Sequence, residues 1–437
     1  MDLTTLVQFR EEIYGCFTKA RDALFNTVDA LVTETQAKSF VELSLSPFFE
    51  RKWPSLYEGF EDGRIDKKRL QDLFIKYLTT NDGEERLILG VDATPIERPF
   101  SCTSPDRTAI PMHNIPNRAA AMTYGWKYST VTVLPEKPSS WTSILDQRRI
   151  PSKKTDIQVA FAQLKEIVPK LPKRPLFLFD RGYDSNWLWC QCTSLNMDSL
   201  GRLKKNRCFY APPPPHSGKR GAPHKDGAKL KLSEPSTHGN PDGTWEGKDL
   251  SGHPVKICWW ENMHVKEARW LNLTIIEVSR PHAPDSERDP RVSWFVYQGE
   301  KCQGDAGLVA LFYVLRFGQE HGYRFDKQSL LWTEARLRTP EQFDRWSQIV
   351  AIVHNLLVLA RDLVEVELRL WENKHRDHTP QQVRRGLAKL LPHLGTPAHP
   401  PKPRGKSNGR SKGEKVGKAK RFAVIFKKPK LPQIVPS

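Results

Sequence analysis

The spacing of hydrophobic residues predicts helices at the start of the chain. Apolar residues recur there every three or four positions, which is the spacing of one helix face: Leu6, Phe9, Ile13, Phe17, Ala20 and Leu24. A second helix is predicted over Lys67–Leu78, because its apolar residues also share one face. We therefore expect residues 1–80 to be helical.

From residue 86 the pattern changes to short apolar runs that are typical of buried strands. The predicted strands are Arg86–Val91, Trp126–Leu134 and Leu176–Phe179. Helical spacing returns at Thr155–Val168 and at Asn186–Leu195. This succession of strands and helices predicts a mixed α/β layer.

A third pattern fills the stretch from about 201 to 300. Residues 211–228 are rich in Pro, Gly and Lys, which predicts a loop. The strand-like runs that follow are Val255–Trp260, Leu271–Val278 and Val292–Tyr297. We interpret this stretch as a β-rich insertion, after which helices are predicted at Gly304–Leu315 and Glu341–Leu370.

These patterns divide the chain into five regions. They are a helical N-terminal region (1–80), the first part of an α/β core (81–200), the β-rich insertion (201–300), a core helix with C-terminal helices (301–400) and a basic tail (401–437). The tail has twelve Lys or Arg residues and one Glu, a net +11 of the chain's +18. Such a composition predicts disorder.

The net charge of +18 indicates a negatively charged binding partner. A chain this basic attracts polyanions, either nucleic acid or an anionic membrane surface. Nucleic acid is the commonest such partner, and the membrane surface remains the alternative. No apolar run approaches the length of a membrane span. The seven scattered cysteines predict reduced thiols and a cytosolic location.

Two aspartates follow predicted strands. Asp92 lies directly after one buried run, in GVDATP, and Asp180 lies directly after another, in LFLFDRGYD. Sites in α/β layers form at such strand ends, and two neighbouring carboxylates repel each other unless a cation lies between them. Mg²⁺ prefers such oxygen ligands. The alternative is that each Asp only forms a turn or caps a helix.

A set of polar residues near position 320 is the third candidate feature. At about 100° per residue, four of them fall within about 60° of one another around a helix: Tyr313, Arg316, Glu320 and Lys327. An acid flanked by two cations and a phenol suits a site that binds both metal and phosphate. A solvated helix face with an ordinary ion pair is the alternative, and Gly322 could end the helix before Lys327.

The pattern Tyr-x2-Arg-x3-Glu-x6-Lys resembles the signature around the third acid of bacterial insertion-sequence DDE transposases. The resemblance covers residues from about 85 to 370. It implies an α/β fold with an RNase H-like mixed-sheet catalytic core, interrupted by the β-rich insertion and flanked by helical N-terminal and C-terminal regions. In such a core Asp92 ends the first strand, Asp180 ends the fourth, and Glu320 lies on a helix after the insertion.

The resemblance also implies an activity. Asp92, Asp180 and Glu320 would be the catalytic residues and the ligands of two Mg²⁺ ions, with Mn²⁺ able to substitute. The enzyme would cleave transposon ends and join them to target DNA by two-metal phosphoryl transfer. It would act on DNA as a homodimer in the bacterial cytoplasm, in association with the nucleoid. Residues 1–80 would bind DNA, and Tyr313, Arg316 and Lys327 would contact it near the acids.

Two other functions remain open at this point. One is a DNA-binding protein of transposase descent that no longer cleaves and acts as a repressor or host factor. The other is an RNase H-like nuclease without strand transfer. The intact set of acids favours an enzyme over the first alternative.

Trp294 is a further candidate for DNA contact, 26 residues before Glu320. In the transposases that the chain resembles, a Trp at a similar place stacks on a base flipped out of the duplex. The alternative is a core Trp in the insertion's sheet. Trp259 and Trp260 are rival candidates for the stacking role.

Overall fold

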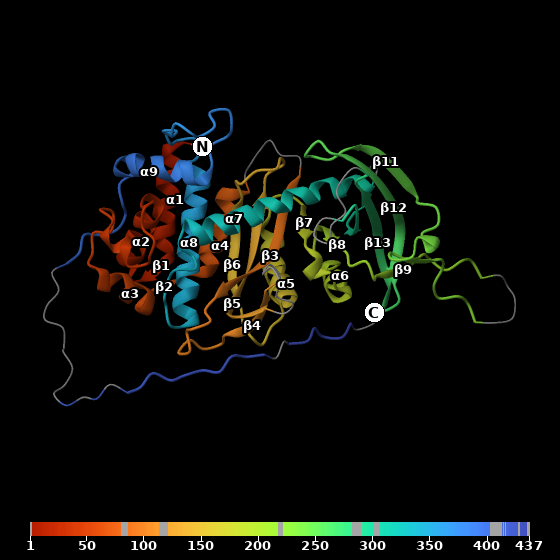
Figure 1. Cartoon of the computed structure of the whole chain (residues 1–437), viewed down its shortest axis with the longest axis horizontal. Helices are drawn as coiled ribbons and strands as arrows, with labels where there is room; N and C mark the ends of the chain where they lie inside the picture. The colour runs from red at the N-terminus through yellow and green to blue at the C-terminus, as the bar shows by residue number, and fades with distance from the viewer. Residues whose placement is uncertain are drawn as a thin grey trace.

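The computed structural model describes the chain except for these residues: 1, 80–85, 113–120, 217–221, 282–289, 301–305, 403–412, 414, 416, 427–428 and 435–437. Helices gather at one end of the molecule, a sheet crosses its middle, and the insertion forms the other end (Figure 1). Within the described ranges, no helix is both long and apolar enough to cross a membrane.

The N-terminal region is helical, as the spacing predicts. Its elements are α1 (Leu3–Cys16), β1 (Phe17–Lys19), α2 (Arg21–Thr33), the 3-10 helix η1 (Glu42–Leu45), α3 (Trp53–Asp62), β2 (Arg64–Ile65) and α4 (Lys67–Leu78). Asp2 and Asp66 cap α1 and α4, because the side chain of each accepts a backbone N–H of the first turn. The short strand β1 separates α1 from α2 by pairing with β2.

These N-terminal helices share one hydrophobic core with the C-terminal helices α8 (Pro340–Ala360) and α9 (Pro380–Leu394). The buried Arg384 of α9 donates to the carbonyls of Leu31 and Ser329, which fixes α9 against α2. The helix expected over Glu341–Leu370 ends at Ala360, and turns follow it. The described residues 2–79 are therefore packed onto the rest of the molecule.

One sheet of 12 strands runs through the described part of the chain. Its strands are β3 (Leu87–Glu97), β4 (Thr108–Met112), β5 (Ala121–Leu134), β6 (Ser143–Ile150), β7 (Pro175–Phe179), β8 (Asp198–Arg202), β9 (Cys208–Tyr210), β10 (Lys229–Lys231), β11 (Gly243–Lys248), β12 (Pro254–Val265), β13 (Ala268–Ser279) and β14 (Val292–Gln298). The order is β10-β9-β12-β13-β14-β8-β7-β3-β5-β4, with β11 beside β12 and β6 beside β5. Antiparallel β3, β5 and β6 followed by parallel β7 and β8 are the arrangement expected of an RNase H-like core.

The insertion extends the core sheet. β14 pairs with β8, from Phe295 opposite Arg202 to Gln298 opposite Ser199, and β13 and β12 follow outward. The three strands predicted for the insertion are therefore confirmed as β12, β13 and β14. β14 is one residue longer than predicted, β13 is four residues longer, and β12 is twice the predicted length. The core and the insertion share one backbone hydrogen-bond network.

Helices cover both faces of this sheet. α5 (Asp156–Ile167) and α6 (Asn186–Cys192) confirm two predicted helices, and short 3-10 helices form at η2 (Val168–Lys170), η3 (Arg181–Tyr183) and η4 (Pro235–Thr237). The helix expected over Gly304–Leu315 differs, because its described part is the 3-10 helix η5 (Ala306–Arg316). It leads directly into α7 (Phe317–Gln328), which crosses the sheet in Figure 1.

The basic tail differs in part from the disorder expected over 401–437. Much of that range lies outside the described residues, but residues 417–426 follow an extended path. Within it, Ile425 forms a parallel β-bridge with Thr108 of β4. The apolar residues of this segment explain the difference, since composition averaged over the whole tail conceals them.

Candidate active site

Asp92 lies in the middle of β3, which corrects the expectation that it directly follows a strand. The strand runs on to Glu97, because β5 continues to pair with β3 as far as Gly125 opposite Glu97. The parallel neighbour β7 ends earlier, at Phe179 opposite Val91. Asp92 therefore lies where β3 loses its partner on one side, which leaves room for a site.

Asp180 directly follows β7, as predicted, and caps the 3-10 helix η3. Its Oδ1 atom accepts the backbone N–H of Gly182 at 2.8 Å. The register of β3 and β7 makes Asp92 and Asp180 the next residues after the last paired positions. The two carboxylates thus come from adjacent strands at one level of the sheet.

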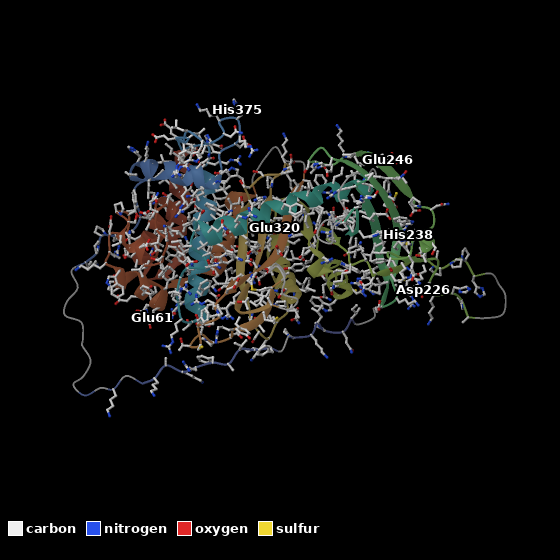
Figure 2. All side chains as sticks on the ribbon, in the orientation of Figure 1. Glu61, Asp226, His238, Glu246, Glu320 and His375 are labelled. Atoms are coloured by element: carbon white, nitrogen blue, oxygen red, sulfur yellow. The ribbon has the colours of Figure 1, made fainter. Side chains whose placement is uncertain are left out.

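Glu320 lies on the first turn of α7 (Figure 2), close enough to Asp92 to affect its charge. Arg316, at the junction of η5 and α7, lies between two of the acids. Its Nη2 atom lies 2.5 Å from Glu320 Oε1, and its Nη1 atom lies 3.5 Å from Asp92 Oδ2. The structure therefore brings these predicted residues together, with Arg316 bridging Asp92 and Glu320.

The charges at this site are unevenly balanced. Burial raises the pKa of Asp92 to about 7, with Asp180 and Glu320 adding to the rise and Arg316 opposing it. Burial opposes the charge of Arg316, but Tyr313, Asp92 and Glu320 outweigh it and raise its pKa. Asp92, Asp180 and Glu320 thus outnumber the two cations that act on them, Arg316 and Lys327, so the site attracts a further cation.

Two other members of the predicted set face the protein. Lys327 lies on α7, which continues through Gly322, and its ammonium donates to Thr94 Oγ1 at 2.6 Å and to the Pro95 carbonyl at 2.9 Å. Tyr313 is buried against Phe295, with ring centroids 4.7 Å apart. The alternative of a solvated helix face is thus wrong for both residues, and any DNA contact by them stays a prediction.

Trp294 is buried in the insertion, where its ring lies 5.6 Å from that of Trp260 and 5.0 Å from that of His238. Its rival Trp259 is also buried, in the core on the other side of the sheet. A flipped base could reach Trp294 only if this cluster opened. The burial therefore favours the core role over the stacking role.

Polar residues that attach α7 to the sheet were missed in the sequence. Gln319 donates to the Thr130 carbonyl at 3.1 Å, and the Tyr323 hydroxyl donates to the Asp92 carbonyl at 3.0 Å. Further along, Asp326 Oδ1 contacts His354 Nδ1 of α8 at 2.7 Å. The spacing of Gln319, Tyr323 and Asp326 by four and three is a helical stripe that could have revealed them.

Comparison with known proteins shows the family to which this chain belongs. A family model described as "DDE superfamily endonuclease" matches residues 12–263, more than half of the chain. The chain belongs to the DDE superfamily endonucleases. The matched range of this DDE endonuclease contains Asp92 and Asp180 and ends before Glu320, so the third acid rests on the structure.

One solved structure similar to this DDE endonuclease is a cryo-EM structure of the piggyBac transposase synaptic complex with hairpin DNA. The identity is 11%, the TM-score is 0.44, and the match covers 90% of this chain and 80% of that chain. A likeness at this level carries no argument about function. Comparison with curated protein sequences gives no match.

The carboxylates at the site of this DDE endonuclease are suitable metal ligands, but their arrangement in the structure does not form a metal site. Three carboxylates are the hard oxygen donors that a divalent cation prefers. Yet within the described ranges, no group of three or more His, Cys, Asp or Glu side chains is arranged to hold a metal ion. Arg316 stands between Asp92 and Glu320, so metal binding would require its guanidinium to move aside.

Proposed function

We propose that this DDE endonuclease is a DNA transposase that cleaves transposon ends and joins them to target DNA. The observation that carries the proposal is the convergence of Asp92, Asp180 and Glu320 around Arg316 on one part of the sheet. The net charge of +18 supports a polyanionic substrate. Action as a homodimer on chromosomal DNA, in the bacterial cytoplasm, belongs to the same proposal.

In this proposal Asp92, Asp180 and Glu320 would hold Mg²⁺, two ions per site. Burial is the main cause of the raised pKa of Asp92, and repulsion from Asp180 and Glu320 adds to it. That repulsion supports metal binding, because a bound cation would relieve it. When bound, the metal activates the attacking hydroxyl group and stabilises charge on the transferred phosphate. Mn²⁺ would substitute for Mg²⁺.

The chain's own residues position these groups. The Gly182 N–H orients Asp180, while Gln319 and Tyr323 fix α7, and with it Glu320, against β5 and β3. Arg316 is the cation best placed to pair with a phosphate oxygen when the acids bind metal. Contact of Tyr313 and Lys327 with the same DNA end belongs to this proposal, and it would require Lys327 to leave Thr94 and Pro95.

A cleavage assay with the full-length protein tests the proposal. Asp92→Asn, Asp180→Asn and Glu320→Gln should each abolish Mg²⁺-dependent cleavage of the element's ends. DNA binding should largely persist, because affinity comes mostly from Lys and Arg. Glu61→Gln, an exposed acid on α3 far from Glu320 in Figure 2, is the matched control. Near-normal cleavage by any acid variant removes that residue from the catalytic set.

One observation favours a second function, that of a DNA-binding protein that does not cleave. The bridge that Arg316 forms between Asp92 and Glu320 neutralises part of the acid set without metal. The same assay separates the alternatives. Cleavage without joined products indicates a nuclease, and intact DNA with either Mg²⁺ or Mn²⁺ indicates the non-cleaving protein.

A further inference from the structure

A short C-terminal segment, residues 422–426, lies along the outer edge of the core sheet. The Phe422 N–H donates to the Cys102 carbonyl at 2.9 Å, and the Ile425 N–H donates to the Arg107 carbonyl at 2.8 Å. In return, the Ala109 N–H donates to the Ile425 carbonyl at 3.1 Å. Figure 1 shows this part of the tail passing β4. These bonds add the segment to the sheet as a parallel strand would.

Side chains strengthen this contact. Arg107 is buried, and its guanidinium donates to the carbonyls of Arg98 and Pro99 and, at 3.4 Å, to that of Phe422. The Phe426 ring meets Tyr124 of β5 edge to face, with centroids 6.1 Å apart. The segment is therefore attached by backbone, guanidinium and apolar contacts together.

The segment also covers a cavity of about 250 Å³. Ile425 and Pro429 line it from the tail, and Thr108 and Ile157 line it from β4 and α5. Gly182, whose N–H orients Asp180, lines the same cavity. The tail and the loop that carries Asp180 therefore line one cavity.

The sequence of the tail fits this placement. Its apolar run FAVIF is flanked in the sequence by Lys418, Lys420 and Arg421 on one side and by Lys427, Lys428 and Lys430 on the other. An edge strand with free backbone groups accepts such an apolar strand readily. The apolar run attaches, and the exposed cations beside it remain available to a polyanion.

We propose that the edge formed by residues 102–109 is a docking site for an apolar β-strand, and that residues 422–426 of the same chain occupy it. Docking holds the flanking cations of the tail against the catalytic core, where they bind the DNA backbone. This second part rests on the proposed function; the docking itself does not.

Hydrogen exchange of the full-length protein tests docking without any DNA. The amides of Ala109 and Ile425 should exchange at least about tenfold more slowly than an open chain. Ile425→Asp should remove that protection at both sites. Ala423→Asp adds the same charge at an exposed position and should keep it, as should the conservative Ile425→Val. Equal protection in the two Asp variants would overturn the docking site.

Two further measurements complete the test. Light scattering decides whether the segment docks within its own chain: a dimer that Ile425→Asp splits would overturn that assignment. Non-specific DNA affinity should fall several-fold more in Ile425→Asp than in Ala423→Asp, since a released tail no longer fixes its cations. One outcome is that Ile425→Asp loses the protection of docking and still binds DNA as tightly as Ala423→Asp does. That result would show that the docked segment has no role in DNA binding, and it would leave the docking site supported.

Discussion

A cluster of charged side chains lies at each end of α7. The two clusters differ in how completely their charged groups are paired. At its start, Arg316 contacts Glu320 at 2.5 Å and Asp92 at 3.5 Å, and its Nε atom has no hydrogen-bond partner within the described structure. In its second half, Asp326 contacts His354 Nδ1 at 2.7 Å, and His354 Nε2 contacts the Thr142 carbonyl at 2.7 Å. One cluster is incomplete and the other is complete.

This difference is the one expected between a charge cluster that stabilises the fold and a charge cluster that binds a ligand. Both ring nitrogens of His354 face acceptors, so both carry hydrogen, and the resulting cation balances Asp326. At the other end, three carboxylates outnumber the two cations that act on them. Buried charges that are fully paired fix a helix in place, whereas an unbalanced set remains ready for a ligand.

The largest expected effect is the loss of the complete cluster. His354→Ala leaves the carboxylate of Asp326 buried without its cation, which should lower the free energy of unfolding by about 3–5 kcal/mol. Urea denaturation measures it. His321→Ala, at an exposed position of α7, is the control and should change stability by less than about 0.5 kcal/mol. Equal losses in the two variants would mean that the cluster does not fix α7.

The next effect concerns DNA and the incomplete cluster. Arg316→Ala should weaken binding of the transposon end by about 1.5–3 kcal/mol, because it removes a charge-assisted contact to phosphate. Lys327→Ala should act in the same direction. Titration of labelled DNA measures both. Arg324→Ala removes an exposed cation of the same helix and should bind almost normally. If Arg324→Ala weakens binding as much, the effect is one of net charge.

A smaller effect is expected from metal. Mg²⁺ at ten times its Kd should raise the free energy of unfolding by about 1.4 kcal/mol, since it binds only the folded site. Asp92→Asn should lose this gain. Denaturation in EDTA and in Mg²⁺ measures the difference. A gain that Asp92→Asn retains would place the cation elsewhere.

The smallest effect is a pH dependence of the complete cluster. Burial opposes the charge of His354, but Asp326 and the Thr142 carbonyl outweigh it and raise its pKa. The stabilisation should be fully present below the ordinary His pKa and be lost as the pH rises through the raised value, with a slope of at most about 1.4 kcal/mol per pH unit. Unfolding midpoints of the wild type and of His354→Gln between pH 6 and 9 measure it. The variant should lack that slope.

Much of the fold could be predicted because local patterns determine it. The apolar runs of β3, β5 and β7 and the periodicity of α5 identify those elements without any partner. β6 could not be found in this way, because it buries polar residues. The side-chain amide of Gln147 donates to the backbone carbonyl of Ser347 in α8. The backbone carbonyl of Gln147 accepts from the side-chain amide of Gln348. Those partners lie some two hundred residues away along the chain.

The sequence predicts which residues form the candidate site better than it predicts how those residues are arranged. Asp180 follows its strand as predicted, but the position of Asp92 depends on how far β5 pairs with β3. The burial of Lys327 and Tyr313 depends on which face of the helix meets the sheet. Likewise, the burial of Trp294 depends on the cluster that packs around it, which includes Trp260 and His238.

Because the insertion and the core share one continuous sheet, the insertion cannot be removed or transferred as an independent unit. An inserted domain with its own closed core could be moved between enzymes as a cassette. Here, removal of β14 would uncover the edge of β8 from Ser199 to Arg202 and leave its backbone groups without partners. Such an edge promotes self-association. A minimal version of this enzyme would therefore need a replacement edge strand, or a lysine or β-bulge that blocks pairing at β8.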